Sequence, residues 1–198
     1  MDFIDILVII SMAIFYIIFF GRIILLYKKG IKVSMIGLGR KKLYVKILES
    51  ASTVLSSLCF IFVIYVALHI DQSEIIVKYY LKINWIKYFG IILCYIGLLI
   101  FLLALISFGK VWRIGIDENN SNKLITSGIF KYSRNPIYLF MDIYFVGILL
   151  IYTNIVFIVI AIGILIGIHI QILREERFLT RKFGEKYREY KSMTRRYI

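Results

Sequence analysis

Two clusters of polar side chains interrupt a sequence that otherwise consists largely of long apolar runs. Glu175 and Glu176 follow one such run, and Arg134 stands just before another. Adjacent carboxylates accept hydrogen bonds from ammonium or hydroxyl groups, whereas the planar guanidinium of arginine pairs with a carboxylate. This combination is typical of a site that binds an amino-acid-like group. The alternative is that the two glutamates only balance the charges of Arg174 and Arg177 beside them.

The cluster around Arg134, the first along the chain, belongs to the segment 124–138, which reads LITSGIFKYSRNPIY and contains the only proline of the chain. The second cluster is the one around Glu175 and Glu176. Proline lacks a backbone N–H and suits the first position of a helix, so Pro136 is predicted to begin one. Arg134 then lies just outside that helix and Tyr138 lies in its first turn. Arginine and tyrosine at a membrane boundary also serve as plain interface anchors, which is the alternative interpretation.

Two further side chains are candidates for the same site. Asp142 is an acidic residue well inside an apolar run, one helical turn beyond Tyr138. An intramembrane carboxylate usually faces the interior of a helix bundle and marks a functional position, although it can simply bond a neighbouring helix. His169 precedes Glu176 by two helical turns on one face, so it either lines the site or packs.

The distribution of apolar residues predicts an all-α, polytopic transmembrane bundle. A helix needs about 20 apolar residues to cross a bilayer core of about 30 Å. The dipeptide Thr153–Asn154 separates the last two apolar runs, and so short a connection predicts an antiparallel helical hairpin. Gly163 and Gly167 form a small-xxx-small pair suited to close helix packing. The five predicted spans are 4–27, 48–69, 88–108, 136–152 and 154–173.

The positive charge is concentrated between and after the predicted spans. Of 25 Lys and Arg residues, seven lie in 28–46, five in 110–134 and nine in 174–196. This is the positive-inside pattern, and it predicts an N-terminus outside and a C-terminus in the cytoplasm. Attraction to anionic lipid headgroups explains the charge better than nucleic-acid binding, which we exclude. The abundance of Ile and Lys suggests a bacterial or archaeal cell membrane.

The segment 174–198 is predicted to form an amphipathic helix leaving the membrane. Its apolar stripe points Glu175 inward, and Gly184 is a candidate break in the helix. We expect a single domain over 1–198. Two cysteines without companions at ligand spacing predict neither a metal site nor a disulfide framework. The stripe consists of Leu179, Phe183, Tyr187 and Tyr190, and the cysteines are Cys59 and Cys94.

Both polar clusters resemble motifs of one enzyme family. The segment 124–138 is similar to its motif of glycine, aromatic residue and Arg-His/Asn-Pro-x-Tyr, and the stretches 175–179, 183–187 and 189–190 are similar to its C-terminal signature. These residues resemble the isoprenylcysteine carboxyl methyltransferases and related phospholipid methyltransferases. The resemblance covers about 124–196, and the earlier spans share only the hydropathy.

The resemblance implies a methyl transfer dependent on S-adenosylmethionine, in a cofactor-binding part over 109–198. It implies a lipophilic or prenylated acceptor, entering from the bilayer, whose methylated group is a carboxyl, thiol or amine. Asn135 stands where many members have histidine, and Phe140 stands where glycine is common. We expect catalytic roles for Arg134, Tyr138 and Asp142, and cofactor binding by Asn135, Pro136, His169, Glu175, Glu176 and Tyr187, the last closing over the cofactor.

Two other functions compete with this interpretation. A membrane reductase of the sterol-reductase type has a similar C-terminal half and uses NADPH. Its cofactor carries an additional phosphate, which calls for clustered arginines, and the pair Glu175–Glu176 fits that requirement less well. A non-catalytic membrane scaffold that has kept the fold would not depend on the glutamate pair at all.

Overall fold

The computed structural model describes residues 2–31, 33, 54, 57–58, 60–68, 83–112 and 124–198. All regular structure within these ranges is helical, as predicted. Residues 60–68 are helical, and the remaining elements follow in chain order. They are α1 (Phe3–Tyr27), α3 (Asn84–Phe108), η2 (Gly109–Val111), η3 (Gly128–Lys131), α4 (Pro136–Ile151), α5 (Ile155–Phe183) and α6 (Glu185–Met193).

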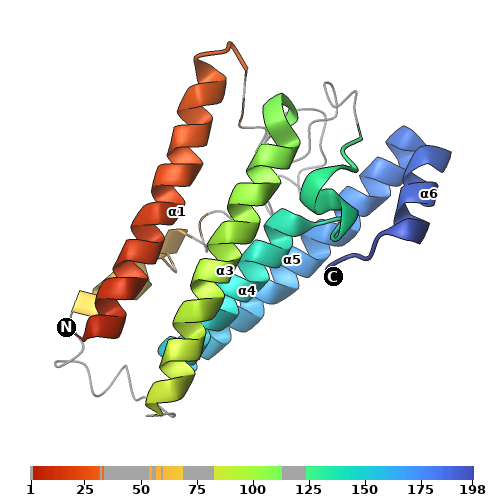
Figure 1. Cartoon of the computed structure of the whole chain (residues 1–198). Helices are drawn as coiled ribbons and strands as arrows, with labels where there is room; N and C mark the ends of the chain where they lie inside the picture. The colour runs from red at the N-terminus through yellow and green to blue at the C-terminus, as the bar shows by residue number, and fades with distance from the viewer. Residues whose placement is uncertain are drawn as a thin grey trace.

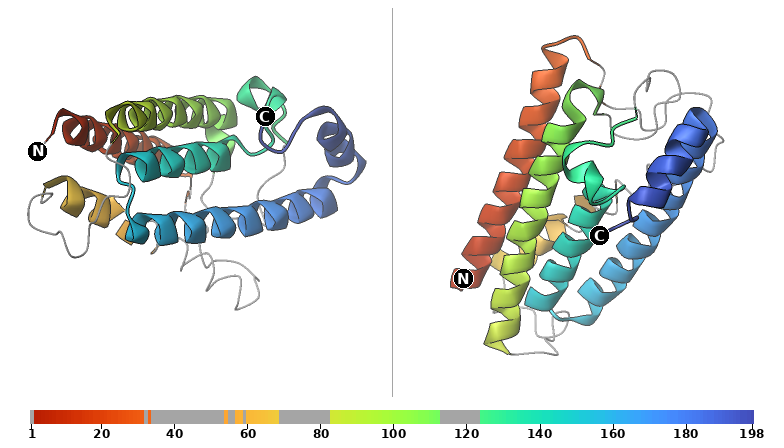
Figure 2. Two further views of the ribbon diagram at one scale, coloured as in Figure 1. Left: turned by 90° about the horizontal axis from the view of Figure 1, so that it is seen from below. Right: turned by 45° about the vertical axis from the view of Figure 1, so that its right-hand side comes forward.

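The long helices pack in a simple neighbour order. Helix α1 lies beside α3, and α4 lies between α3 and α5 (Figure 2, left). The C-terminal ends of α1, α3 and α5 lie at one end of the bundle, together with η3, α6 and the start of α4 (Figure 1). That end therefore brings together both polar clusters of the sequence.

Three of the predicted spans correspond to helices long and apolar enough to cross a membrane. These are α1, the helical run 84–111 that includes α3, and α5, with mean hydropathies of 2.7, 3.0 and 2.8. Helix α4 begins at Pro136 as predicted but has only 16 residues. With a rise of about 1.5 Å per residue, its length is about 24 Å. The predicted span 48–69 lies largely outside the described residues. Three membrane-spanning helices are thus supported by length and composition.

The predicted hairpin between α4 and α5 is present. Tyr152 ends α4, and Asn154 caps α5 by accepting a hydrogen bond of 3.0 Å from the backbone N–H of Phe157. An asparagine cap satisfies one of the unpaired N–H groups at a helix start. The hairpin sends α5 back toward the start of α4, so its polar end reaches the segment before Pro136 (Figure 1).

The polar part of the sequence after 173 does not form one separate helix. Helix α5 continues without interruption to Phe183, and only then does the chain turn into α6. The predicted break at Gly184 is confirmed, because its φ is 55°, a conformation that other residues rarely adopt. At about 43 Å, α5 is longer than a bilayer core of about 30 Å. Its last turns therefore project beyond its apolar part.

Two glycines far apart in sequence allow α3 and α4 to approach each other closely. A Cβ added to Gly147 would lie 2.7 Å from the carbonyl oxygen of Gly90 and 2.8 Å from Sγ of Cys94. Small residues allow such backbone approach between membrane helices. The sequence instead suggested Gly163 and Gly167 for close packing, but a Cβ on Gly167 would meet nothing within 4 Å. The close helix packing through glycines is therefore between α3 and α4.

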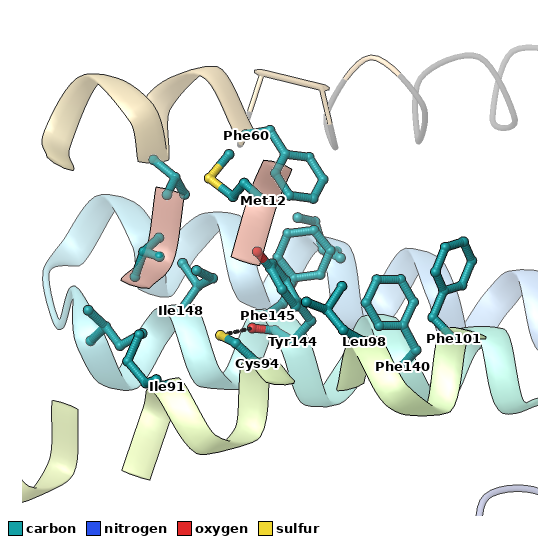
Figure 3. Packing of buried hydrophobic residues seen from close by; sticks show 14 of the residues in the cluster. Met12, Phe60, Ile91, Cys94, Leu98, Phe101, Phe140, Tyr144, Phe145 and Ile148 are labelled. Carbon is teal, nitrogen blue, oxygen red and sulfur yellow. Dashed lines mark hydrogen bonds between the residues drawn. The ribbon is translucent and has the colours of Figure 1, made fainter. Parts of the chain in front are cut away.

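Aromatic side chains fill the interior between α1, α3, α4 and the helical residues 60–68. Phe101 and Phe140 stack with ring centroids 4.7 Å apart, and Phe60 contacts both Tyr144 and Phe145 (Figure 3). Such ring pairs add to the stabilisation from apolar burial. Phe140, which replaces the glycine common in the resembling family, is thus part of this aromatic core and is 4% exposed.

Polar contacts fasten α1 to its neighbours at three heights. Near its start, buried Asp5 accepts a hydrogen bond of 2.9 Å from the hydroxyl of Tyr152. At mid-height the hydroxyls of Ser11 and Tyr144 are 2.9 Å apart. Near its end, Arg22 donates to the carbonyls of Leu105 and Gly109, which close α3. A cation at the C-terminal end of a helix also interacts favourably with the helix dipole.

Candidate functional site

The turn before α4 is shaped by one glycine and one serine. Gly128 has a φ of 64°, and the hydroxyl of Ser107 accepts a hydrogen bond of 3.3 Å from the N–H of Ile129. A Cβ on Gly128 would collide with that hydroxyl oxygen, so only glycine fits against α3 here. This contact fixes η3 against the end of α3 and directs the following residues toward α5.

Glu176 is the centre of a buried ionic cluster. Its Oε1 accepts hydrogen bonds from Nη2 of Arg134 at 3.0 Å and from Nε of Arg196 at 3.1 Å, and its Oε2 accepts from Nη2 of Arg196 at 2.9 Å. Asn135 also donates to Oε1, at 3.4 Å. The side chain of Glu176 is only 5% exposed, and a carboxylate that deep requires such partners.

The same residues hold the segment 194–198 against the start of α4. Arg134 donates from its side chain to the carbonyls of Lys191 and Thr194, and its backbone N–H donates to the carbonyl of Arg195. The carbonyl of Arg196 accepts from Ser133 at 3.3 Å and from Asn135 at 3.2 Å. The first polar cluster, the second cluster and the chain after α6 therefore form one hydrogen-bonded unit.

Glu175 has a different hydrogen-bond environment, outside the ionic cluster. Its Oε2 accepts a hydrogen bond of 2.8 Å from the hydroxyl of Tyr138. The side chain is partly exposed, and Tyr138 is the hydrogen-bond partner that the described residues offer it. The sequence predicted that Glu175 points inward, and its carboxylate does reach α4, while Glu176 beside it is buried as well. Successive helical residues point about 100° apart, so only one of the pair can face the arginines.

Asp142, His169 and Tyr197 extend the site along α4 and α5. Oδ1 of Asp142 is buried and has no hydrogen-bond partner among the described residues. The hydroxyl of Tyr197 lies 3.4 Å from Nδ1 of His169, which is itself exposed. Burial and the negative charge of Asp142 raise the pKa of Tyr197, so that charge acts on the tyrosine. The buried oxygen of Asp142 is therefore an acceptor suited to a donor group of a ligand.

The residues around the ionic cluster have shifted pKa values. The hydrogen bond to Glu176 raises the pKa of Arg196, which keeps this guanidinium charged. Burial raises the pKa of Tyr187, and the negative charge of Glu176 raises it further. Burial likewise raises the pKa of Tyr190 to about 12, and its hydroxyl donates to the carbonyl of Phe130 at 2.6 Å. Both tyrosines of the predicted stripe are thus buried, whereas Leu179 and Phe183, which lie on α5, are half-buried.

Most of the residues singled out from the sequence converge at this one end of the bundle. Two ionic or hydrogen-bonded pairs, Arg134–Glu176 and Tyr138–Glu175, join the two clusters. Asp142 and His169 approach the same region through Tyr197. The contact of Arg196 with Glu176 was not predicted from the sequence. Its only signal was a second arginine beyond the amphipathic stripe, which gave no indication of a partner twenty residues earlier.

Comparison with known families gives the same assignment as the two motifs. A family model described as phospholipid methyltransferase matches residues 85–186, a little over half of the 198 residues. The match includes Arg134, Tyr138, Glu175 and Glu176. The chain belongs to this family. No curated protein matches the sequence. The phospholipid methyltransferase match confirms the resemblance drawn from the motifs, and this membrane methyltransferase family accounts for the apolar helices.

The side chains present fit S-adenosylmethionine as a methyl donor. That molecule carries an ammonium group and a ribose diol, which need acceptors, and a carboxylate, which needs a cation. Partly exposed Glu175 and the buried oxygen of Asp142 are such acceptors. Arg134 and Arg196 supply guanidinium groups within the same cluster. These carboxylates and guanidinium groups are therefore complementary to the amino-acid and ribose parts of S-adenosylmethionine.

Proposed function

We propose that this protein is an integral membrane methyltransferase of the isoprenylcysteine carboxyl methyltransferase type, dependent on S-adenosylmethionine. It transfers a methyl group to a lipophilic acceptor at the cytoplasmic membrane face. The observation that carries the proposal is the pairing of the two family motifs through Tyr138–Glu175 and Arg134–Glu176, inside the stretch that the family model matches. A chance arrangement of surface charges would leave these pairs apart.

The roles of the residues follow from their burial. Glu175, with one hydrogen bond from Tyr138 and a partly exposed side chain, binds the hydroxyl or ammonium groups of the donor. Glu176 is held by Arg134 and shapes the floor of the site. Asn135 and Pro136 fix the start of α4, and both are buried. Each of these residues therefore acts on the donor either directly or by holding a neighbour in place.

Asp142, His169 and Tyr187 lie around the part of the site where the methyl acceptor binds or where the site is closed from solvent. Asp142 lies one helical turn beyond Tyr138, toward the apolar part of α4, where a lipophilic acceptor reaches the donor. His169 lines the exposed flank through its contact with Tyr197. Tyr187, which is 1% exposed, closes the cluster from α6.

The reaction requires little acid-base chemistry from the protein. When bound, S-adenosylmethionine supplies a methyl group that its sulfonium already activates. A carboxylate or thiolate acceptor needs no general base, so the side chains mainly align the reactants and exclude water. The buried aromatic side chains of α4 and α6 keep water out, and the hydrogen bond from Tyr138 orients Glu175.

The position of the site in the membrane supports the proposal that the acceptor is lipophilic and that the reaction takes place at the cytoplasmic face. The helix ends that carry the site lie together at one end of the bundle (Figure 1). Because α5 changes there from apolar to polar residues, an acceptor embedded in the bilayer reaches the site from the side. In the topology that the positive-inside rule predicts, the three basic segments lie on the cytoplasmic side of the membrane. A bacterial or archaeal cell membrane with five spans is the arrangement consistent with this charge distribution.

Methyl transfer from labelled S-adenosylmethionine in proteoliposomes tests the proposal. Acceptors of three classes are offered: a prenylcysteine with a free carboxyl, an ethanolamine lipid and a lipophilic thiol. We expect label in the prenylcysteine as a base-labile methyl ester, lost when Glu175→Gln is introduced and kept in Glu189→Gln. Glu189 is a matched control because it is an exposed glutamate of α6. Base-stable label in the amine or thiol would overturn the carboxyl assignment, and label in none would overturn the activity.

A further inference from the structure

The two arginines that hold Glu176 are anchored very differently. The side chain of Arg134 is 7% exposed, whereas that of Arg196 is 32% exposed. Arg134 also donates to the carbonyls of Lys191 and Thr194. The side chain of Arg196 bonds Glu176 alone within the described part of the chain. The guanidinium of Arg134 is therefore held by several partners, whereas that of Arg196 is held by Glu176 alone among the residues that the structure describes.

Loss of each contact would have a different cost. Moving Arg134 would break its ion pair with Glu176 and its bonds to the carbonyls of Lys191 and Thr194. Because its guanidinium is buried, losing these partners is costly. Moving the guanidinium of Arg196 breaks only its bonds to Glu176, and the exposed part of the group stays hydrated. Glu176 would keep Arg134 and Asn135 as donors. Release of Arg196 therefore leaves Oε1 of Glu176 with two donors, and only Oε2 loses the donor it has among the described residues.

The charge balance of the cluster favours an incoming carboxylate. Arg134, Arg196 and Glu176 together carry one net positive charge. The main chain of Arg196 is fixed independently, because its carbonyl accepts from Ser133 and Asn135. The guanidinium can thus change partner without the segment 194–198 leaving the site. A planar guanidinium anchored in this way is suited to bind a carboxylate with two hydrogen bonds.

We infer that Arg196, and not Arg134, is the residue that binds the α-carboxylate of the methyl donor, exchanging its bonds to Glu176 for bonds to that carboxylate. The inference rests on the proposed function, since it names the side chain that recognises one group of S-adenosylmethionine. It gives Arg196 the role that the sequence suggested for Arg134, and it leaves Arg134 as the residue that positions Glu176.

A comparison of two ligands isolates the contact. Binding of S-adenosylmethionine and of its decarboxylated analogue is measured by calorimetry on detergent-purified full-length protein. The wild type is compared with Arg196→Gln, Arg196→Lys and Arg195→Gln. Arg195 is the matched control because it is an exposed arginine one position earlier that contributes only its backbone carbonyl. A change that merely loosens the structure weakens both ligands alike and leaves the ratio of their affinities unchanged.

We expect the wild type and Arg195→Gln to prefer S-adenosylmethionine by about tenfold or more, as a charge-assisted contact implies. Arg196→Gln abolishes the preference, and Arg196→Lys, which keeps the charge but not the planar fork, leaves an intermediate one. If Arg196→Gln does not fold, the reduced ratio in Arg196→Lys decides. A wild-type ratio retained in the folded Arg196 variants overturns the inference. Absence of binding by the wild type would instead contradict the proposed function.

Discussion

Tyr138 donates a hydrogen bond of 2.8 Å to Glu175, a residue 37 positions later in the chain. One partner lies in the first turn of α4 and the other near the polar end of α5. The short hairpin between these helices makes them antiparallel, so residues near the start of one and near the end of the other become neighbours. The contact therefore couples the two family motifs directly.

Removal of the Tyr138 hydroxyl should weaken the binding of S-adenosylmethionine with little loss of stability. In Tyr138→Phe the ring remains, but Glu175 loses the donor that orients it. Hydrogen bonds to a charged group contribute about 1.5–3 kcal/mol, so we expect an affinity lower by about tenfold or more. Calorimetry measures the affinity and thermal unfolding measures the stability. Tyr132→Phe is the control, since Tyr132 is 72% exposed; equal affinities in the two variants would contradict the role of Tyr138.

For Tyr152→Phe we expect a loss of stability and no change in the affinity for S-adenosylmethionine. Tyr152 donates to buried Asp5 at the far end of α4, away from the site. Loss of that donor leaves a buried carboxylate oxygen with one partner fewer, at a cost of about 1–3 kcal/mol. Thermal unfolding in detergent should shift downward while the affinity for S-adenosylmethionine stays unchanged. Tyr88→Phe, at a residue 49% exposed, should shift neither quantity. Weaker donor binding in Tyr152→Phe would mean that the two ends of the bundle are coupled.

The closest contact between α3 and α4 should not tolerate a methyl group. Gly147→Ala places a Cβ 2.7 Å from the carbonyl oxygen of Gly90, so the helices must separate or the ring packing beside them must adjust. Overpacking of this kind costs about 1–3 kcal/mol. Gly167→Ala is the control, because its Cβ meets nothing within 4 Å and alanine is the better helix former. Unfolding temperatures lower for Gly147→Ala and unchanged or higher for Gly167→Ala are expected; the reverse order would refute the packing.

Alkaline pH should destabilise the protein partly through Tyr190. Burial raises the pKa of this hydroxyl to about 12, so the folded state holds its proton more tightly than the unfolded state, whose pKa is about 10. The resulting stability is complete below about pH 10 and is lost as the pH rises toward about 12. The difference in unfolding free energy between wild type and Tyr190→Phe should therefore shrink over that interval, as measured by chemical denaturation. A difference that stays constant would show that the hydroxyl ionises normally.

The sequence predicted helix boundaries well where local rules decide them. Pro136 begins α4 because proline suits a first helical position, and Gly184 ends α5 because glycine readily adopts its positive φ. The connection at Thr153–Asn154 is also as expected. Motif identity was equally accessible, since segments 124–138 and 175–190 carry it in their residue types.

Side-chain partners were not predictable to the same degree. Which glutamate faces the arginines depends on the rotation of α5 against α4, and a single sequence does not fix that angle. The contact of Gly90 with Gly147 requires two helices in one register, whereas Gly163 and Gly167 are spaced within a single helix, and a Cβ on Gly167 would meet nothing within 4 Å. Arg196 reaches Glu176 only because the chain folds back after α6. These are tertiary relationships, and local patterns do not encode them.

The role of the glutamate pair in binding S-adenosylmethionine is tested most directly by calorimetry on the detergent-purified protein and on the double variant Glu175→Gln/Glu176→Gln. Glu185→Gln/Glu189→Gln, which alters two exposed glutamates of α6, is the matched control. We expect micromolar binding by the wild type and by the control, and none by the variant at Glu175 and Glu176. Absence of binding by folded wild-type protein, or unchanged binding when both glutamates are neutralised, would contradict this role.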